Sequence, residues 1–527
     1  MITSASITGA SFLAGEWIMP AGETFSSFDP KEEVKFGQFG SCGPDEVQSA
    51  VHAAAEAFQV TRTWTGKEVA TFLRQVAQEI EALGEVLLQT ADRETGLGIP
   101  RLTGERGRTC SQIRAFADLA ERGEWVQASI DLADPERTPF PKPDLRRMMR
   151  PLGPVAVFGA SNFPFAFGAL GGDTASAWAA GNPVVVKGHP AHPATSELFA
   201  QAVEKAIEGT GAPAGIFSLL QGTSHELGRA LVKHPVIEAV GFTGSLGGGR
   251  ALMDLAAART RPIPVFAEMG SINPIFIGPN TLKANAKGIA TGLAGSVCLG
   301  TGQFCTSPGV VVTSSNEVFE HALAEAMHDA PRGTLLHAGI AQALAAGLDR
   351  LKAHEEVEAI ATDGYRGDTM TPPNSAFMVS AEAFLADPRL SEEIFGPVTL
   401  IVDCQTEAQM LEVACQLEGN LTASIHADHD PDLRKALLPW LEQAVGRVIF
   451  NGYPTGVEVN SSQQHGGPYP STSAGSTTSV GMDAIVRFAR FVAFQNAPEE
   501  LLPDALKSAN PLGISRKVNG VATTASC

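Results

Sequence analysis

Five short apolar runs, separated by turn residues, decide the fold of this sequence. They read, in chain order, PVAVF (154–158), PVVVK (183–187), IFSLL (216–220), IEAVGF (237–242) and PVFA (264–267). The stretches between them, such as 195–208 and 226–233, have the apolar spacing of helices. Strands that alternate with helices form a parallel sheet covered on both faces, so we expect an α/β fold with a Rossmann-like sheet. Ligands of such sheets bind at the carboxyl ends of the strands.

A second α/β alternation follows from Pro274 onward. Its expected strands are 274–278, 309–313, 397–403, 421–426 and 446–450. On the other side of the central runs, residues 1–35 favour surface strands and residues 44–120 favour helices. Residues 460–481 are rich in Ser, Thr, Gly and Gln and predict a long loop, a kind of segment that is often functional in a compact domain. Residues 484–494 are expected to form a helix or a strand that packs against the rest of the protein.

Composition narrows the class of protein. A chain of 527 residues predicts two or three domains, and its net charge of -19 argues against nucleic acid or an anionic membrane as a partner. Seven cysteines without a Cys-x-x-Cys pair predict neither a disulfide framework nor a metal site. The segment 1–15 lacks the features of a signal peptide, and the uncharged runs 151–172 and 288–316 are too interrupted to span a membrane. We therefore expect a cytoplasmic protein.

Cys305 is the strongest candidate for a reactive group. A lone cysteine is most often buried core, but this one lies in the uncharged stretch Gly302-Gln-Phe-Cys305-Thr, with Gly300 nearby. Glycines at that spacing indicate a close approach of backbone, which favours a built site for a nucleophilic thiolate.

Two further polar residues follow predicted strands. Glu268 comes directly after the run 264–267, where its carboxylate is either one member of an ion pair or a general base for water. Asn162 lies in Ser161-Asn-Phe-Pro164, where its amide either satisfies a turn or binds a developing oxyanion.

The carboxyl ends of the strands also suggest a phosphate-bearing ligand. Lys187 ends an apolar run, and its amine either snorkels to solvent or binds phosphate or ribose. Phe242-Thr-Gly-Ser245 leads into a glycine-rich turn with hydroxyl and backbone donors for a pyrophosphate, or simply a flexible turn. The usual G-x-G-x-x-G fingerprint is absent, so the sheet pattern alone supports a nucleotide only weakly.

Taken together and in this order, these motifs closely resemble the aldehyde dehydrogenase superfamily. The matching pieces are Asn162-Phe-Pro164, Gly181-Asn-Pro-Val-Val-Val-Lys187, Phe242-Thr-Gly-Ser245, Glu268-Met-Gly270, Gly302-Gln-Phe-Cys305 and Glu393-Ile-Phe-Gly-Pro397. The resemblance implies a cofactor-binding domain (1–134 and 154–267), a catalytic domain (268–480), an oligomerisation element (135–153 and 481–500) and a C-terminal tail (501–527). It also implies a homodimer or homotetramer.

The resemblance further implies a role for each residue. Cys305 attacks an aldehyde, Asn162 and the backbone N–H of Cys305 hold the oxyanion, and Glu268 activates the water that hydrolyses the thioester. The cofactor contacts implied are Phe158, Lys187, Gly244, Ser245, Gly249, Glu393 and Phe395. The substrate contacts implied are Phe163, Phe304, Arg108 and Arg114.

Departures from the family pattern refine the prediction of the cofactor and the substrate. Members that prefer NAD usually carry a glutamate three residues after the strand-end lysine, and this sequence has Pro190 there. Without that carboxylate a 2′-phosphate is not repelled, so we predict NADP as the preferred cofactor and NAD as the alternative. These departures, with the stretch from Gln463 to Ser479, resemble a branch that contains α-ketoglutarate semialdehyde (2,5-dioxopentanoate) dehydrogenases and an NADP-dependent fatty aldehyde enzyme. The expected substrate is therefore an aldehyde that carries a carboxylate.

Three other functions stay open at this point. The aldehyde could be a different semialdehyde or a fatty aldehyde. The acyl group could pass to coenzyme A or phosphate, although Glu268 favours water as the acceptor. The chain could also be a binding protein on the same fold, which the presence of Cys305, Glu268 and Asn162 argues against.

Overall fold

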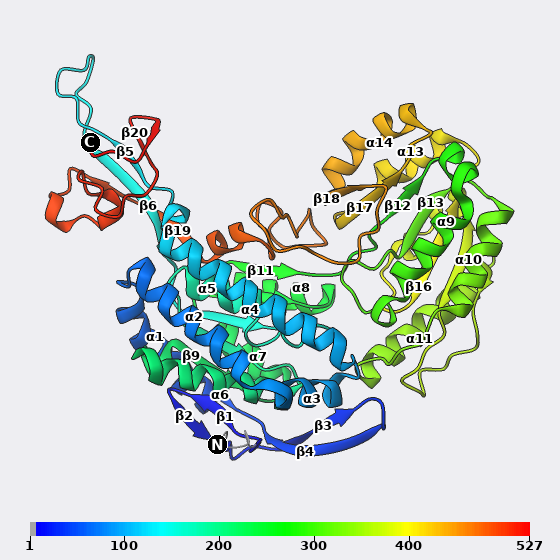
Figure 1. The fold of residues 1–527 in the computed structure, drawn as a ribbon, viewed down its shortest axis with the longest axis horizontal. Coiled ribbons are helices and arrows are strands. Elements are labelled where there is room, and N and C mark those ends of the chain that lie inside the picture. The colour runs from blue at the N-terminus through cyan, green and yellow to red at the C-terminus, as the bar shows by residue number, and fades with distance from the viewer. Residues whose placement is uncertain (1–6) are drawn as a thin grey trace.

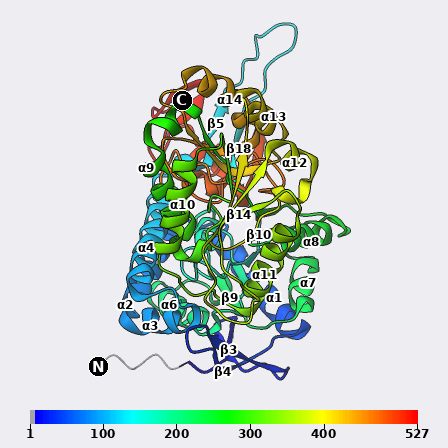
Figure 2. The ribbon, with the colours of Figure 1, turned by 90° about the vertical axis from the view of Figure 1, so that its right-hand side faces the viewer.

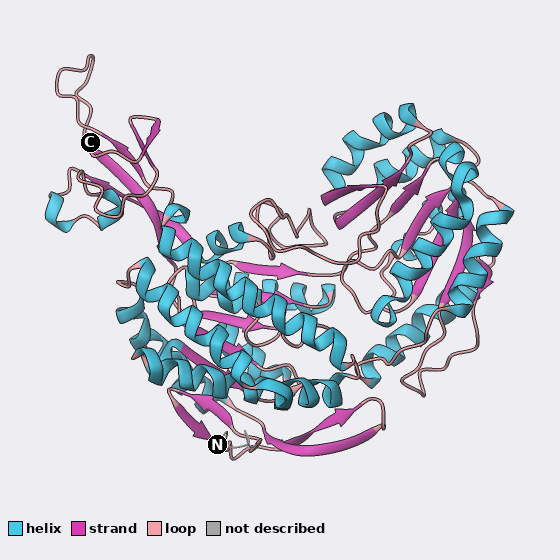
Figure 3. Ribbon diagram, in the orientation of Figure 1, coloured by secondary structure: helices cyan, strands magenta, loops and turns pink. Residues whose placement is uncertain are grey.

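Two α/β lobes and a protruding arm make up the molecule (Figure 1). The computed structural model describes residues 7–527, so the predicted start of the cofactor-binding domain at residues 1–6 lies outside the described range. Helices lie on both sides of the strands in each lobe, whereas the arm consists mainly of strands and loops (Figure 3). Figure 2 views the molecule from the side of the second lobe. Across residues 7–527, none of the helices is long and apolar enough to cross a membrane.

The first lobe is built on a seven-stranded sheet with the order β11-β10-β7-β8-β9-β1-β2. All five apolar runs of the central segment form its parallel strands, and the two N-terminal strands close one edge in the antiparallel sense. From β7 the chain continues outward to β8 and β9 and then returns to the opposite side of β7 as β10. Ligands of such sheets bind where the strand order reverses, so the crevice lies beside β7. The strands are β1 (Ser11–Leu13), β2 (Glu16–Ile18), β7 (Val155–Phe158), β8 (Val184–Lys187), β9 (Phe217–Leu220), β10 (Ala239–Thr243) and β11 (Val265–Glu268).

The continuous apolar character of β7 follows from burial on both faces. Val155 and Val157 pack into the core under α2–α6, whereas Ala156 and Phe158 pack into a second core with α1, α7 and α8. Alternate side chains of a strand point to opposite faces, so a doubly covered strand cannot alternate apolar with polar residues. The helices are α1 (Pro44–Thr61), α2 (Gly66–Ala82), α3 (Gly84–Thr95), α4 (Ile99–Arg122), α5 (Gly172–Ala179), α6 (Pro193–Thr210), α7 (His225–Lys233) and α8 (Leu246–Ala257).

The second lobe has its own seven-stranded sheet, with the order β14-β15-β16-β13-β12-β17-β18. Five of these strands coincide with predicted runs, whereas β14 and β15 were not predicted. The strands are β12 (Ile275–Ile277), β13 (Val310–Thr313), β14 (Glu358–Ala361), β15 (Ser375–Ser380), β16 (Val398–Asp403), β17 (Asn420–His426) and β18 (Val445–Phe450). The helices are α9 (Pro279–Cys298), α10 (Glu317–Asp329), α11 (Ala338–Ala353), α12 (Ala381–Ala386), α13 (Glu407–Gln416) and α14 (Pro431–Ala444).

The arm is a five-stranded sheet with the order β19-β6-β5-β20-β21. Its strands are β5 (Ser129–Asp131), β6 (Leu145–Pro151), β19 (Ala489–Gln495), β20 (Arg516–Val518) and β21 (Val521–Thr523). The segment predicted as a helix or strand at 484–494 is both, because a 3-10 helix (Met482–Phe488) precedes β19. A separate ribbon of β3 (Thr24–Asp29) and β4 (Val34–Gly40) lies below the first lobe (Figure 1).

The strand pairing changes two of the predicted boundaries. β5 pairs with β6 and with β20, so residues 129–131 belong to the sheet of the arm and not to the first lobe. For the same reason the segment 501–527 is not a separate tail, since β20 and β21 complete that sheet. The backbone groups of β5 require partners on both sides, and the C-terminal segment supplies those on one side.

Candidate active site

Cys305 lies in the loop between α9 and β13, and neighbouring backbone fixes that loop. The loop follows a 3-10 turn in which Gly302 has φ +65°. A Cβ atom at Gly302 would come 2.1 Å from the carbonyl carbon of Gly396, so only glycine fits there. The side-chain amide of Asn273 donates to the main-chain oxygen of Cys305 at 2.9 Å. The position of the thiol is therefore determined by rigid backbone.

Glu268 is the last residue of β11, and its side chain is buried. Two side chains of the long loop 460–481 contact its two carboxylate oxygens. His465 places Nε2 at 2.9 Å from Oε1, and the Ser479 hydroxyl donates to Oε2. A single β-bridge between Glu268 and Thr472 joins the same loop to the strand end. The loop predicted at 460–481 thus lies against the proposed base.

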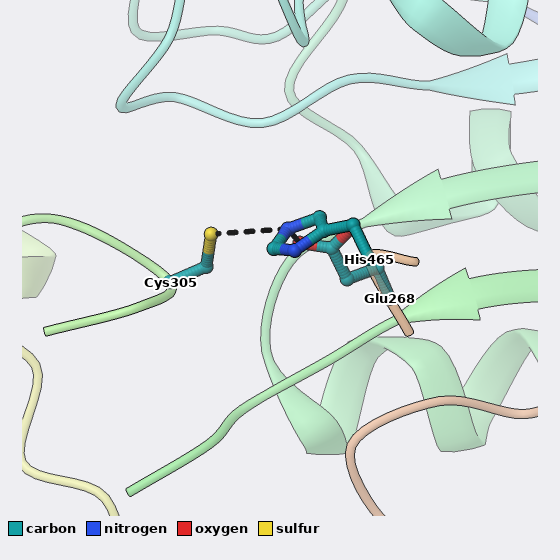
Figure 4. A group of neighbouring side chains, drawn as sticks. All are labelled: Glu268, Cys305 and His465. Carbon is teal, nitrogen blue, oxygen red and sulfur yellow. Dashed lines mark hydrogen bonds and ion pairs between the residues drawn. The ribbon is translucent and has the colours of Figure 1, made fainter. Parts of the chain in front are cut away.

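His465 also contacts the proposed nucleophile. Figure 4 shows its ring facing the sulfur of Cys305 and overlapping the carboxylate of Glu268 in this view, and the distance from Nε2 to Sγ is 3.5 Å. The reactive atoms of the three side chains all lie within 4.8 Å of one another. The other ring nitrogen, Nδ1, is buried and has no hydrogen-bond partner within the described part of the chain.

The two acidic groups of this cluster are shifted in opposite directions. Burial raises the pKa of the Cys305 thiol well above its usual value, and the nearby charge of Glu268 adds to this effect. Burial also acts to raise the pKa of Glu268, but His465 and the hydrogen bonds from Ser479 and the thiol outweigh it and leave that pKa below its usual value. Burial and charge thus favour the thiol over the thiolate at Cys305, and the hydrogen bonds favour the carboxylate over the acid at Glu268.

Asn162 is buried in the loop after β7, next to the segment that carries Cys305. Its Nδ2 donates to the main-chain oxygen of Gln303 at 2.9 Å, and its own main-chain oxygen accepts from Nη2 of Arg101 at 2.8 Å. An amide nitrogen carries two hydrogens, so one remains for a substrate oxygen. The structure brings together all three residues predicted to be catalytic.

The predicted substrate contacts Phe163 and Phe304 also lie together. Their rings are edge to face with centroids 5.1 Å apart, and Phe167 extends the cluster at 5.5 Å from Phe163. The guanidinium of Arg101 lies 4.9 Å from the ring centroids of Phe163 and Phe304. These aromatic rings give the region next to the nucleophile an apolar wall with a cation beside it.

The structure separates the two arginines predicted to contact substrate. Arg108 is half-buried beside the ring of Phe167, at 5.4 Å, and its positive charge acts on both Cys305 and Glu268. Arg114 instead forms an ion pair with Glu81 at 2.6 Å on the molecular surface, with 41% of its side chain exposed. Six residues rotate a helix by about 600°, so Arg114 faces roughly 120° away from Arg108. The assignment of Arg114 to the substrate site is wrong.

A pocket of about 560 Å³ opens at the carboxyl ends of β7, β8 and β10. Four of the predicted cofactor residues line it, namely Phe158, Lys187, Gly244 and Ser245. The Ser245 hydroxyl caps α8 by accepting from the amide of Gly248 at 3.2 Å, which leaves the positive end of the helix dipole beside the pocket. A strand-end lysine, glycines and a helix N-terminus suit a dinucleotide with its pyrophosphate.

The remaining predicted cofactor residues do not line this pocket. A Cβ atom at Gly249 would lie 2.5 Å from the sulfur of Met269, so this glycine serves the packing of α8 against the strand. Glu393 and Phe395 belong to the second lobe, where they line a smaller enclosed pocket together with Phe304. These two residues therefore lie near the Cys305 loop and not beside Lys187.

The lining of the larger pocket is basic. Burial lowers the pKa of Lys187 to about 8, and His189, Pro190 and Arg229 lie around it. None of the residues that line this pocket, all of them within the described range, is an aspartate or a glutamate. Pro190, three residues after Lys187, lies at the wall of this pocket.

Sequence reasoning missed three residues of the site, His465, Ser479 and Arg101. The first two lie in the loop 460–481, whose length and composition were a signal, but nothing in its sequence indicates which side chain points inward. Arg101 lies one helical turn before Glu105 on α4, and the amphipathic pattern of that helix does not distinguish a site-facing arginine from an exposed one.

Comparisons with known proteins agree with this arrangement. The model of the aldehyde dehydrogenase family matches residues 17–489. Alpha-ketoglutaric semialdehyde dehydrogenase 2 of Azospirillum brasilense is 46% identical over 98% of this chain and 99% of the relative. Alpha-ketoglutaric semialdehyde dehydrogenase of Acinetobacter baylyi is 43% identical over the same shares. The 1-pyrroline-5-carboxylate dehydrogenase of Thermus thermophilus has the same fold, with a TM-score of 0.78 at 23% identity over 92% of both chains.

The matched range includes nearly all of both lobes, the pocket beside Lys187 and the whole Cys305 cluster. It leaves out β1 and the C-terminal strands of the arm, which contribute nothing to that cluster. This chain belongs to the aldehyde dehydrogenase family and is an NAD(P)-dependent enzyme of that family.

Proposed function

We propose that this enzyme oxidises α-ketoglutarate semialdehyde (2,5-dioxopentanoate) to 2-oxoglutarate and prefers NADP. The names of the two relatives that are 43% and 46% identical support the substrate. The meeting of Cys305, Glu268 and Asn162 in one site carries the proposed reaction, since a nucleophile, a base and an oxyanion donor are the groups that oxidation through a thioester requires.

Each of these side chains has one task. The sulfur of Cys305 attacks the aldehyde carbon, and the second N–H of the Asn162 amide, with the backbone N–H of Cys305, binds the oxygen as it becomes negative. A bound nicotinamide cofactor would supply the hydride acceptor that this oxidation needs. Glu268 then removes a proton from water, and the resulting hydroxide displaces the sulfur to release the acid.

The residues that would hold the cofactor come from both lobes. Lys187 and Ser245 suit the phosphates and a ribose, and Glu393 and Phe395 lie on the side of Cys305. NADP carries an additional phosphate, and the basic lining with Pro190 in place of a glutamate favours it.

The variant Pro190→Glu tests the preference for NADP. A carboxylate at this place repels the 2′-phosphate, so the ratio of kcat/KM for NADP over NAD should fall about tenfold or more. Pro190→Gln is the matched control, because it has the same size without the charge. A wild-type enzyme with NAD favoured tenfold, or equal ratios in the two variants, would contradict the proposed preference.

The distal carboxylate of the substrate requires a cation in the channel, and we propose Arg108 for this role. Its Nη2 contacts the main-chain oxygen of Val457 at a long 3.4 Å, and its Nη1 is buried without a hydrogen-bond partner among residues 7–527. Arg108 takes part in none of the ion pairs found within residues 7–527, although the charge of the buried Glu105 acts on its guanidinium. An unpaired guanidinium N–H next to the site suits a carboxylate ligand.

The proposed activity is tested by the absorbance of NADPH with a set of aldehydes that differ at the far end. We expect the highest kcat/KM for 2,5-dioxopentanoate, lower values for succinate semialdehyde and a long-chain aldehyde, and no activity in Cys305→Ser. Added coenzyme A should leave the rate unchanged, because Glu268 provides a base for water. No turnover of any aldehyde, or turnover only with coenzyme A, would reject the proposal in favour of a binding protein or an acyl-transferring enzyme.

A further inference from the structure

Two side chains of α4, Arg101 and Glu105, hold the loop that carries Asn162. We propose that Glu105 is a positioning residue for the oxyanion donor, because its carboxyl group fixes the turn after Asn162 and so keeps one amide N–H aimed at the aldehyde oxygen. This inference rests on the proposed oxidation of an aldehyde through a thioester and adds to it a residue that acts through Asn162.

The loop contains a turn that leaves two backbone amides without a local partner. The amide of Phe167 donates to the main-chain oxygen of Phe163 at 3.1 Å, which closes one helical turn. The first amides of such a turn have no acceptor inside it, and the residue before the turn usually supplies one from its side chain. Phe163 stands at that place and has no side-chain oxygen. Pro164 has no N–H, so the amides of Phe165 and Ala166 are the two that require an acceptor.

Glu105 supplies this acceptor from a different element. Its Oε1 accepts from the amides of Phe165 at 2.8 Å and of Ala166 at 2.9 Å, and only 5% of the residue is exposed. Its Oε2 has no hydrogen-bond partner within residues 7–527, so the two amides are the partners that fix the carboxyl group. A buried amide without a partner costs as much as a lost hydrogen bond, and the turn therefore depends on this side chain.

Arg101 holds the same loop from the same face of the helix. It precedes Glu105 by four positions, which places the two side chains one above the other on α4. Its Nη2 donates to the main-chain oxygen of Asn162 at 2.8 Å. The side chain of Asn162 uses one amide hydrogen for the main-chain oxygen of Gln303, at 2.9 Å. A shift of the turn would therefore turn the second hydrogen away from the place of the aldehyde oxygen.

The role as an acceptor does not require a charge. Burial raises the pKa of Glu105, while the N–H of Ala166 and the charge of Arg101 act in the opposite direction. The carbonyl oxygen of a glutamine can accept the same two N–H bonds. Glu105→Gln thus keeps both bonds, whereas Glu105→Met, with an unbranched apolar side chain of similar length, loses both. The pair of variants separates the acceptor from the filling of space.

Single-turnover kinetics test the proposal. With the enzyme in excess over the aldehyde, the rate at which reduced cofactor forms reports the steps before hydrolysis by Glu268. In Glu105→Met this rate should fall about 100-fold, because a misplaced oxyanion donor costs that much. Glu105→Gln should recover it to within about threefold of the wild type. A wild-type rate in Glu105→Met, or equal losses in the two variants, would overturn the proposal.

Glu105→Asp keeps the proposal testable if Glu105→Met does not fold, since it retains the carboxyl group but is one methylene shorter. Its oxygen cannot reach both amides, so the single-turnover rate should fall about tenfold while the Kd of the reduced cofactor stays within about twofold of the wild type. Circular dichroism shows whether each variant folds. A wild-type rate in Glu105→Asp would contradict a positioning role.

Glu197→Met is the matched control for loss of stability. Glu197, on α6, is also buried and accepts from two main-chain amides, those of Thr8 at 2.6 Å and Gly9 at 2.9 Å, but these belong to the N-terminal segment. The control should lower Tm and leave the single-turnover rate at the wild-type value. A loss of rate as large as that in Glu105→Met would show that general destabilisation, not the loop, slows the reaction.

A double variant shows whether Glu105 acts through Asn162. In the background Asn162→Ala, the further change Glu105→Met should alter the single-turnover rate less than about threefold, because the donor that it positions is already absent. If the two changes instead multiply their separate losses, Glu105 does not act through the amide, and the proposal fails.

Hydrogen exchange gives a readout that needs no turnover. Mass spectrometry of the peptide that spans residues 160–170 should show faster exchange in Glu105→Met than in the wild type and in Glu105→Gln. Equal exchange in all three proteins would overturn the proposed hold on the loop. If the wild type oxidises no aldehyde but the exchange still depends on Glu105, the proposed function fails while the attachment of the loop to α4 stands.

Discussion

Arg108 and Arg114 lie on the same helix, six residues apart, but only Arg108 is placed to act on a substrate. Arg108→Ala should raise KM for 2,5-dioxopentanoate by about 10- to 100-fold, because a charge-assisted hydrogen bond of about 1.5–3 kcal/mol is lost. A neutral aldehyde of similar length should be affected less than about threefold by the same change.

The matched control for this variant is Arg114→Ala, which removes only a surface ion pair with Glu81. It should leave KM for both aldehydes unchanged. Steady-state kinetics on the two substrates decide the matter, and an equal rise of KM for the charged and the neutral aldehyde in Arg108→Ala would show that Arg108 only shapes the channel.

Site residues that stand at a recognisable place, such as the end of a strand, could be predicted from the sequence. Glu268 ends a strand, Asn162 follows one, and Cys305 is preceded by a glycine that the backbone of Gly396 requires, so each stands at a place where the fold exposes a side chain. His465 has no such marker. Its inward direction results from contacts with residues almost 200 positions earlier, such as Glu268, and no local pattern records them.

Among the elements, α6 shows how a buried carboxylate can link stability to pH. Glu94, on α3, accepts from the amides of Ala194 and Thr195 in the first turn of α6, at 2.8 Å each. The side chain is fully buried, and burial raises its pKa to about 7. In the unfolded chain this carboxyl group loses its proton near its ordinary value of about 4.3.

The direction of the pH effect on stability follows from proton binding. Between about pH 4.5 and 7 the folded state holds a proton that the unfolded state has lost, so stability falls as the pH rises through this window, by on the order of 3 kcal/mol in total. Glu94→Gln cannot ionise and should lose less stability between pH 5 and pH 8 than the wild type, whatever its stability at pH 5. Thermal shift at the two pH values measures this, and equal decreases of Tm in both proteins would contradict it.

Elements with a continuous apolar pattern could be predicted, and elements that depend on distant partners could not. The strands of the first sheet are buried on both faces and are recognisable for that reason. In contrast, β14 carries mostly exposed or half-buried residues and pairs at the edge of the second sheet. The strands β20 and β21 have only three residues each and exist because β5 provides a partner.

At the scale of the whole molecule, the arm remains the proposed contact between subunits. It extends away from both lobes (Figure 1), and it exposes large apolar side chains such as Val521, which is 68% accessible. A surface of this kind on an isolated chain is typical of an interface.

The charge-introducing variant Val521→Glu tests whether the arm forms the contact between subunits. Light scattering after size-exclusion chromatography should give a smaller mass for this variant than for the wild type, which we expect to be a dimer or tetramer. Val318→Glu is the control, because Val318 is 53% exposed on α10 in the second lobe and should leave the mass unchanged. A monomeric wild type, or equal masses for all three proteins, would show that the arm does not form the contact between subunits.

The loop that carries His465 and Ser479 is made late, since residue 465 stands near the end of a chain of 527. A ribosome has therefore synthesised almost nine-tenths of the polypeptide before the cysteine meets its imidazole. Until then Glu268 has neither of its two hydrogen-bond partners, so the site cannot be complete before the C-terminal part of the chain is made.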